Sequence, residues 1–151
     1  MTTFAIKNCN GKIPLEVKFH DEDLLILNKY KDNLDNIRSQ IDNQNINFYI
    51  DYIVNSLFEA NKYFNDQEPW KKKDDKIRLN TIVYTTLEIV RKISFLLYPI
   101  IPESSLKALK IFDIEEKNIK LDSVSNNEYL TKGNSIHKID ILFKKIEKNN
   151  D

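Results

Sequence analysis

"DDKIRLNTIVYTTLEIVRKISFLLY", residues 74–98, is the segment that decides the fold. Apolar side chains recur through it at spacings of three and four residues, which is the period of an α-helix. One face of the helix is lined by Leu79, Val83, Thr86, Val90, Ile93 and Leu97. The apolar face is made wider by Ile82, Ile89 and Leu96. A helix with so wide an apolar face packs on more than one side, so we predict that it is the central helix. Glu88 and Lys92 are four residues apart and are expected to pair on its outer face.

Two shorter helical patterns precede this segment. The apolar positions are Leu27, Tyr30, Leu34, Ile37 and Ile41 in residues 20–41, and Ile50, Ile53, Leu57, Ala60 and Phe64 in residues 45–66. Both sets follow helical spacing. Asp21 is the expected N-cap of the first helix, and Asn45 or Asn47 that of the second. Pro69 ends the second helix, and Glu68 before it is expected to be extended.

Glycine and proline residues mark where helices end before residue 20 and after residue 98. Residues 1–9 are expected to form the end of a helix that stops at Gly11, and Pro14 begins an extended linker. Pro99 and Pro102 force a corner after the central helix, and a short helix follows them. With only two glycines in 151 residues, the chain favours long helices over a turn-rich β fold.

These segments define one domain, residues 1–151. Residues 113–135 are polar and irregular, and the tail after them carries apolar residues at Ile139, Leu142, Phe143 and Ile146. The sequence therefore predicts an all-α fold, an antiparallel helical bundle with a docked C-terminal tail. Its expected parts are the end of a first helix and a linker (1–14), the bundle core (21–112), and a return connection with the tail (113–151).

The composition limits the possible functions. Lys+Arg and Asp+Glu are both 23, so the formal net charge is +0, and binding of nucleic acid would need a local basic patch. Cys9 is the only cysteine, which excludes an internal disulfide and fits a reducing cytosol. The longest apolar run, residues 93–101, is too short to span a membrane. We therefore expect a cytoplasmic protein with no membrane partner.

No catalytic or metal-binding constellation is evident. His20 and His137 have no neighbour at ligand spacing, and Ser104 and Ser105 lack the glycines of a nucleophile elbow. The acidic clusters stand at segment starts, where matching of the helix dipole and solvation explain them. We predict no catalytic residue and no metal site in this chain.

The only tryptophan stands in "NDQEPWKKKDD", residues 65–75. In one interpretation, the indole of Trp70 packs one helix end onto the next and the lysines are a solvated cap. In the other, Pro69 keeps the ring on the surface, where a single-stranded base stacks on it for about 1–3 kcal/mol. The neighbouring cations would then meet phosphates, and the candidates are Lys71, Lys72, Lys73 and Arg78.

"FEANKYFNDQEPWKKKDD" (58–75), followed by a long apolar helix and "LLYPIIPESS" (96–105), resembles the anticodon-binding domain of methionyl-tRNA synthetases. The matching residues are Asn61, Tyr63, Pro69, Trp70, Pro99, Pro102 and Glu103. In the tail "HKIDILFKKIE" (137–147) the family pattern is met by Lys138, Leu142, Phe143, Ile146 and Glu147. Lys144 and Lys145 stand where that family usually has Pro and Arg. "TTFAIKNCNGKIP" (2–14) resembles the end of the domain's first helix.

The resemblance implies that Trp70 stacks on the anticodon, that Pro69 fixes the turn presenting it, and that Asn61 either touches the anticodon loop or makes a buried hydrogen bond. It also implies a C-terminal fragment of an enzyme that ligates methionine to tRNA with ATP and magnesium. The expected partners are methionine tRNA and an upstream catalytic domain. No class I catalytic signature is present, so this chain is expected neither to catalyse nor to hold a cofactor, and to bind tRNA weakly.

Two alternatives stay open. The chain also fits the corresponding domain of an isoleucyl-, valyl-, leucyl- or cysteinyl-tRNA synthetase, because those class I enzymes carry a comparable tryptophan. It also fits a generic helical protein-interaction module in which Trp70 is buried.

Overall fold

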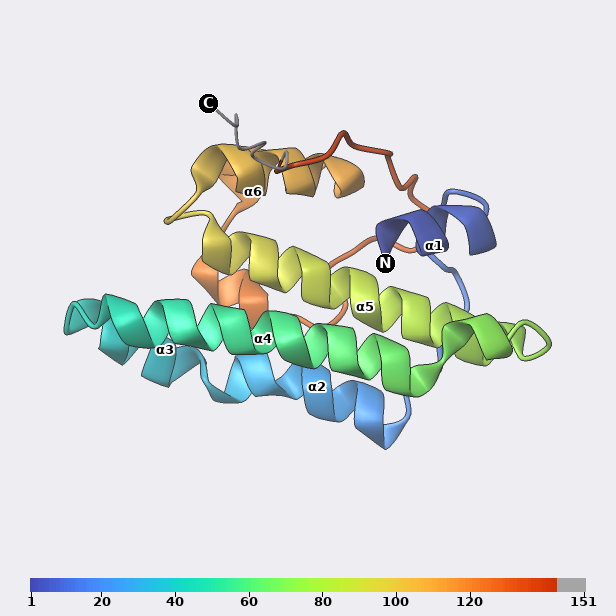
Figure 1. Ribbon diagram of the computed structural model, residues 1–151, viewed down its shortest axis with the longest axis horizontal. Helices are drawn as coiled ribbons and strands as arrows, with labels where there is room; N and C mark the ends of the chain where they lie inside the picture. Colours follow the sequence, from blue (N-terminus) through green and yellow to red (C-terminus); the bar gives the residue numbers. More distant parts are fainter. Residues whose placement is uncertain (144–151) are drawn as a thin grey trace, which may run out of the picture.

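Helix α5 (Lys76–Leu97) runs through the middle of the molecule, with α4 (Ile46–Gln67) and α2 (Asp21–Asp32) on one side and α6 (Pro102–Leu109) on the other (Figure 1). The computed structural model describes residues 1–143. Two short helices, α1 (Thr2–Asn8) and α3 (Leu34–Asp42), complete the α-helices of this range. Short 3-10 turns follow at η1 (Pro69–Lys71), η2 (Lys110–Phe112), η3 (Glu116–Asn118) and η4 (Leu121–Ser125). The predicted all-α bundle is confirmed.

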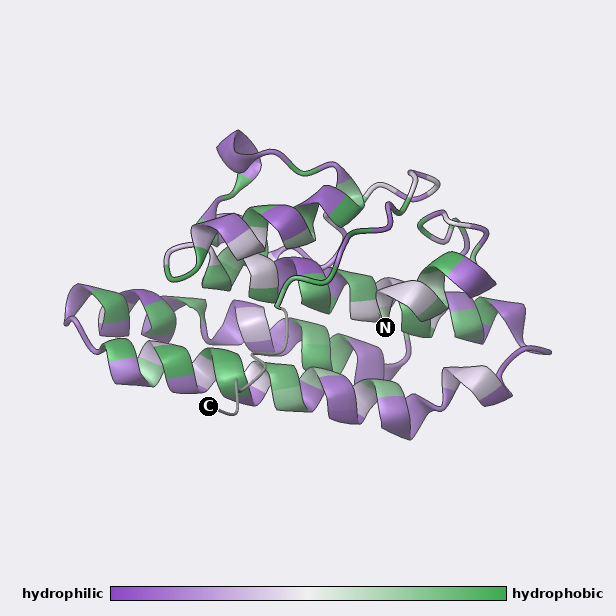
Figure 2. Ribbon diagram, turned by 45° about the horizontal axis from the view of Figure 1, so that its top comes forward, coloured by the Kyte–Doolittle hydropathy of each residue, from purple (hydrophilic) through white to green (hydrophobic). Residues whose placement is uncertain are grey.

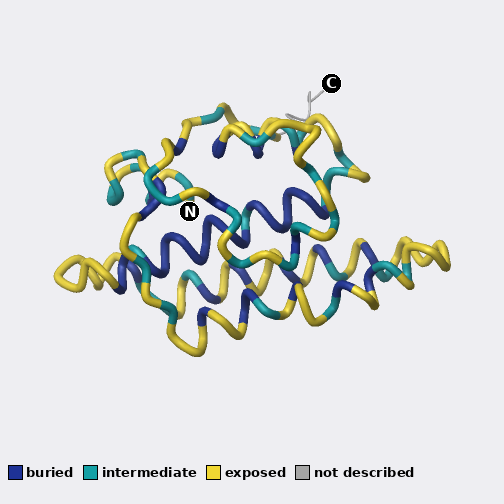
Figure 3. Tube along the Cα trace, turned by 180° about the vertical axis from the view of Figure 1, so that it is seen from behind, coloured by how far each residue is buried: buried dark blue, intermediate teal, exposed yellow. Residues whose placement is uncertain are grey.

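The central position of α5 is confirmed by its burial on every side. Seventeen of its 22 residues are buried, and Figure 3 shows the trace dark along most of its length. Since apolar burial is worth about 25 cal/mol per Å², this helix contributes more to the core than any amphipathic helix with one buried stripe.

The predicted surface pair on α5 is wrong. Glu88 and Lys92 are both fully buried. Glu88 pairs instead with Arg91, whose Nε lies 2.8 Å from its Oε2, and accepts the backbone N–H of Leu130 at 2.7 Å. Lys92 donates to the carbonyl oxygen of Val124 at 2.5 Å. These side chains face the return segment, so we call Glu88, Arg91 and Lys92 the return anchor.

The helix predicted over residues 20–41 is two helices, because the chain breaks at Asn33 between α2 and α3. The N-cap of α2 is His20, not Asp21. The His20 backbone N–H donates to the Asp23 carboxylate at 2.8 Å, which satisfies one free donor of the first turn. Ile41, expected on the buried face, is 43% exposed.

Helix α4 begins as predicted and buries a slightly different face. Asn45 caps it, its Oδ1 accepting the N–H of Phe48 at 3.2 Å. The buried residues are Tyr49, Ile53, Ser56, Ala60 and Tyr63, whereas Ile50 and Leu57 of the predicted stripe are exposed. Figure 2 shows apolar segments recurring along the length of this helix. Because apolar residues occur on more than one side of α4, periodicity alone did not decide which side faces α5.

The chain closes by returning to its start. Ser135 forms an isolated bridge with Lys12, and the Ile136 N–H donates to the Gly11 carbonyl at 2.7 Å. The His137 N–H then donates to the Ile111 carbonyl at 2.9 Å. The tail is therefore docked up to this point, while Ile141 and Phe143 are exposed. The predicted tail positions Lys144, Lys145, Ile146 and Glu147 lie outside the described residues.

Candidate functional site

The turn between α4 and α5 is built around Glu68 and Pro69. Proline disfavours a right-handed helical residue before it, and Glu68 ends α4 in the left-handed region at φ 45° and ψ 56°. The predicted extended conformation is therefore wrong, although the helix does end here. Pro69 is buried and opens η1. It fixes the backbone so that the next residue, Trp70, leaves the bundle surface.

The indole of Trp70 is accessible. The residue is 43% exposed, and Figure 3 shows the turn between α4 and α5 as one of the most exposed parts of the trace. Its inner edge packs on Phe64, with ring centroids 6.2 Å apart at 61°. Phe64 in turn packs edge-on against Phe4, with centroids 5.6 Å apart. The ring is thus supported by Phe64 while the residue stays partly exposed to solvent, which a platform for a base requires and a fully buried packing residue would not show.

The three lysines after Trp70 are all exposed. Lys71 forms a salt bridge with Glu68, its Nζ 2.7 Å from Oε1. Within residues 1–143, Lys72 and Lys73 form no salt bridge. Lys76, one turn later, donates to the Asn8 carbonyl at 2.8 Å. The cations that face solvent beside the indole are therefore Lys72 and Lys73, with Lys71 partly neutralised.

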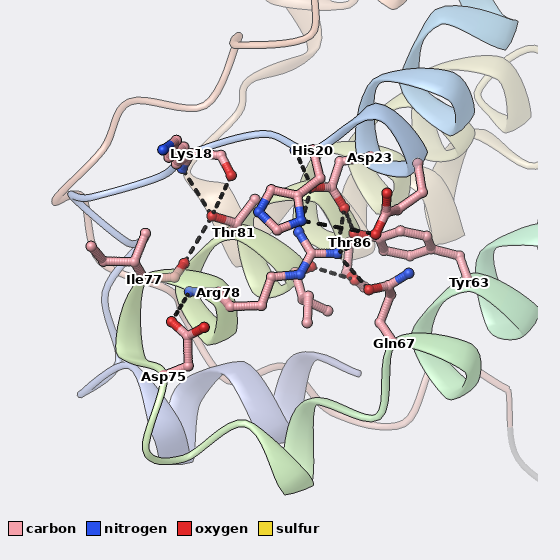
Figure 4. A network of polar contacts seen from close by, with 12 residues as sticks. Lys18, His20, Asp23, Tyr63, Gln67, Asp75, Ile77, Arg78, Thr81 and Thr86 are labelled. Atoms are coloured by element: carbon pink, nitrogen blue, oxygen red, sulfur yellow. Dashed lines mark hydrogen bonds and ion pairs between the residues drawn. The ribbon is translucent and has the colours of Figure 1, made fainter.

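We call Lys71, Lys72 and Lys73 the lysine patch. Arg78 does not belong to it. Its side chain is 7% exposed and forms two hydrogen bonds with Asp23, from Nη1 at 2.6 Å and from Nη2 at 3.1 Å. A phosphate could not reach this guanidinium without breaking a buried ion pair, so the predicted phosphate contact is wrong. Figure 4 shows Asp23, Tyr63 and Gln67 gathered around Arg78.

Asp23 is the centre of this cluster, and it is fully buried. Its carboxylate also accepts the hydroxyl of Tyr63, and Gln67 accepts a further N–H of Arg78. Burial alone would raise the pKa of Asp23, but hydrogen bonds from Arg78, Tyr63 and the His20 backbone outweigh it and hold the pKa below its usual value. The sequence carried a signal for this role, because Asp23 precedes Leu27 by one turn and so lies on the apolar face.

Asn61 lies on the exposed side of α4. The buried hydrogen-bonding role considered for it is therefore wrong. Within residues 1–143 its side chain forms no hydrogen bond to the protein, so it stays accessible from solvent. A contact with an anticodon loop stays a prediction.

Neither a metal site nor a membrane-spanning helix is found in the described part of the chain. Within residues 1–143, no three His, Cys, Asp or Glu side chains gather closely enough to hold a metal ion. None of the helices over the same range combines the length and hydropathy needed to cross a membrane. His20 caps a helix, and His137 contacts Asp113 at 2.6 Å, so each histidine is explained locally.

Comparison with known proteins agrees with the helical bundle. A family model described as the anticodon binding domain of methionyl tRNA ligase matches residues 13–151. The methionine–tRNA ligase of Brucella suis biovar 1 is 36% identical over 109 residues, covering 72% of this chain and 21% of that protein. The corresponding protein of Mycobacterium leprae is 35% identical over 128 residues, covering 82% of this chain and 24% of its own length.

Solved structures show the same fold. The apo form of Mycobacterium tuberculosis methionyl-tRNA synthetase superposes with a TM-score of 0.88 at 27% identity, covering 98% of this chain and 30% of that one. The same enzyme in complex with methionyl-adenylate superposes with a TM-score of 0.86 at 28% identity, covering 95% and 29%. The bundle is therefore that of the helical domain of an aminoacyl-tRNA synthetase.

The chain belongs to the family of anticodon-binding domains of methionyl-tRNA ligases. It spans about a fifth of the length of the Brucella relative. The family match includes the whole α4–α5 turn and the tail, and it leaves out residues 1–12.

Proposed function

We propose that this domain reads the anticodon of methionine tRNA through Trp70, as one part of a methionine–tRNA ligase. The observation that carries the proposal is a tryptophan that is 43% exposed, at a turn that lies within the residues matched by the family model. Stacking on one face of the ring buries apolar area without needing a hydrogen-bond partner, and each stacked base contributes about 1–3 kcal/mol.

The surroundings of Trp70 have assigned parts in this proposal. Pro69 fixes the turn, and Lys71, Lys72 and Lys73 are placed to neutralise phosphates of the anticodon loop. Because Asp74 and Glu68 lie in the same turn, this patch adds steering and salt dependence more than affinity. Asn61 is assigned a polar contact with the loop. The whole chain, residues 1–151, acts in this account as a single domain.

The chemistry belongs to another part of the same polypeptide. The relatives are named methionine–tRNA ligases, and one solved relative is in complex with methionyl-adenylate. A catalytic domain in the same chain would join methionine to the tRNA using ATP and magnesium, and this domain would select the tRNA. We place the whole enzyme in the cytoplasm, where tRNA is charged for translation.

The test is a titration of labelled RNA hairpins, followed by fluorescence anisotropy. A hairpin with the methionine anticodon should bind more tightly than hairpins with isoleucine, valine, leucine or cysteine anticodons. Trp70→Ala should abolish this preference, while Trp70→Phe, which keeps a smaller ring, should retain part of it. Equal binding of all hairpins, or no binding at low salt, would favour a helical interaction module instead.

The lysines are tested by the salt dependence of the same binding. Lys72→Ala combined with Lys73→Ala should weaken all hairpins to a similar degree and lower the slope of log K against log salt by about 0.7 for each phosphate that is no longer neutralised. A control with Lys117→Ala, an exposed lysine of η3 far along the sequence from the turn, should leave the slope unchanged.

A further inference from the structure

We propose that Arg78, Asp23 and Gln67 act together as positioning residues that hold the Trp70 turn in the conformation that binds a base. We call these three residues, with Tyr63, the corner clamp. The inference rests on the proposed function, since it assigns to a buried cluster the control of that same RNA-binding surface.

The first observation is that the clamp joins three separate helices. Asp23 comes from the first turn of α2, Gln67 is the last residue of α4, and Arg78 lies in the first turn of α5. One guanidinium bridges all three, because it forms a bidentate pair with Asp23 and donates a further hydrogen bond to Gln67. Arginine suits this role because its fork of donors has a fixed geometry that lysine lacks.

The second observation is where the bridged atoms lie relative to the turn. Gln67 stands directly before the turn and Arg78 shortly after it, so their hydrogen bond fixes the separation of its two ends. Arg78 also donates its backbone N–H to the N-cap Asp75 at 3.0 Å. Both the side chain and the main chain of Arg78 therefore restrain the segment that carries Trp70 (Figure 4).

The third observation is the place of the indole itself. The last turns of α4 carry Tyr63, whose hydroxyl donates to Asp23, and Phe64, whose ring supports Trp70. A rotation of this helix end would move the clamp and the aromatic support together. The clamp thus acts on the ring through α4 and through the turn, although none of its residues contacts a base.

If the Trp70 ring were mobile in the free protein, binding of a base would have to immobilise it. An exposed ring that stacks on a base therefore needs support from the residues beneath it. Immobilising one rotamer-rich side chain on binding costs free energy that a preorganised site has already met during folding. Asp23, Tyr63 and Arg78 of the clamp are buried and Gln67 is half-buried, so salt and RNA charge compete only weakly with the Arg78–Asp23 pair.

The experiment replaces Gln67, the uncharged member of the clamp that accepts from Arg78. Its replacement leaves Arg78 and Asp23 paired with each other, so no buried charge loses its partner. Gln67→Met keeps the length and helix propensity of the side chain and removes the acceptor. We expect the rotational freedom of Trp70 in the free protein, read from time-resolved fluorescence anisotropy, to increase. We also expect the anticodon hairpin to bind about twofold to tenfold more weakly, the range that ordering one side chain contributes.

Two further variants separate positioning from stability. Gln67→Glu retains an acceptor for Arg78 and should restore the restricted motion of Trp70. Ile53→Val, on the buried face of α4 but away from the turn, should lower thermal stability without changing Trp70 motion or the relative affinity for the hairpin. Trp70 motion that is unchanged in Gln67→Met, or increased equally in Ile53→Val, overturns the clamp.

The outcomes also distinguish this inference from the proposed function. If the wild-type domain binds no hairpin, the proposed function fails, and the clamp is judged by Trp70 motion alone. If the wild type binds and Gln67→Met binds equally well, the proposed function stands and the positioning role is wrong.

Discussion

Helix α5 carries two buried ionic clusters that do different work. The corner clamp, at its N-terminal end, joins side chains of three helices beneath an exposed turn. The return anchor, in its middle, uses Arg91 and Lys92 to hold backbone carbonyls of residues 123–126, and Glu88 to hold the Leu130 N–H. The first cluster restrains a surface that faces solvent, whereas the second fixes an irregular segment that has no helix of its own to satisfy its backbone.

The return anchor shows how buried side-chain donors hold an irregular segment in place. Segment 121–130 forms only a 3-10 turn, η4, so its carbonyls lack regular partners within the segment. Leaving them buried and unpaired would cost about 1–3 kcal/mol each. Arg91 and Lys92 of α5 donate hydrogen bonds to three of them, which attaches the return segment to the central helix. We expect the return anchor to matter chiefly for stability, and the corner clamp for stability and for the proposed RNA-binding surface.

The largest effect is expected at the return anchor. Arg91→Met removes the partner of the fully buried Glu88 and frees the carbonyls of Ser123 and Asn126. Breaking a buried pair in this way costs about 3–5 kcal/mol, to be measured by urea unfolding. Adding Glu88→Gln should recover part of the loss, because it removes the unpaired charge. A loss below about 1 kcal/mol would mean that the return segment holds itself in place.

A smaller effect, with a pH signature, is expected at the corner clamp. Asp23→Asn should lower the free energy of unfolding by about 2–3 kcal/mol at pH 7, because Arg78 keeps Gln67 as a partner. Since the pKa of Asp23 is lowered by folding, its contribution is present above about pH 4 and disappears as the pH falls through the lower folded value. The difference in stability between the two proteins should therefore shrink as the pH falls below about 4. A difference that does not shrink would point to altered packing instead.

The stability contributed by the return anchor should change at neutral to alkaline pH, whereas that of the corner clamp changes in acid. Burial, with Arg91 nearby, lowers the pKa of Lys92 from 10.5 to about 7. The unfolded state then binds more protons above pH 7, so stability should rise with pH from about 7 to 8.5, by about 1–2 kcal/mol. Lys92→Met should flatten this rise in thermal melts, and Lys132→Met, at a partly exposed lysine, should not. A rise of equal size in Lys92→Met would show that another group causes it.

The sequence predicted the fold better than it predicted the ionic clusters, and the reason is physical. The wide apolar stripe of residues 74–98 is a property of one segment, and it correctly placed α5 at the centre. The spacing of Glu88 and Lys92 is the same whether they face water or a distant segment. Glu88 has one local partner, Arg91, but the backbone groups that Glu88 and Lys92 bind lie more than 30 residues away in a stretch without pattern. Long-range polar contacts of this kind leave no local signal.

At the candidate site, too, local features could be predicted from the sequence and long-range contacts could not. Exposure of Trp70 was one of the two interpretations left open for it, argued from the local effect of Pro69, and the 43% exposure of the residue agrees with that interpretation. Arg78 looked like part of the lysine patch, because its burial depends on Asp23, 55 residues away. One clue was present, since Asp23 lies on the apolar face of α2. A charge on an apolar face predicts a buried partner of opposite sign, and only the fold identifies that partner.

The smallest effect is expected at Asp75. Substitutions of this residue test whether the cap of α5 contributes to RNA binding as well as to folding. Asp75 caps α5, its Oδ1 accepting the Arg78 N–H at 3.0 Å, and it also places a negative charge in the lysine patch. Asp75→Ala should cost about 1 kcal/mol through loss of the cap. Asp75→Asn keeps a capping acceptor and removes the charge, so stability should hold while hairpin binding strengthens at low salt. If Asp75→Ala bound the hairpin as tightly as Asp75→Asn, the cap would serve folding alone. Weaker binding by the alanine variant, at equal net charge, would mean that the main-chain restraint on Arg78 helps to hold Trp70 in place.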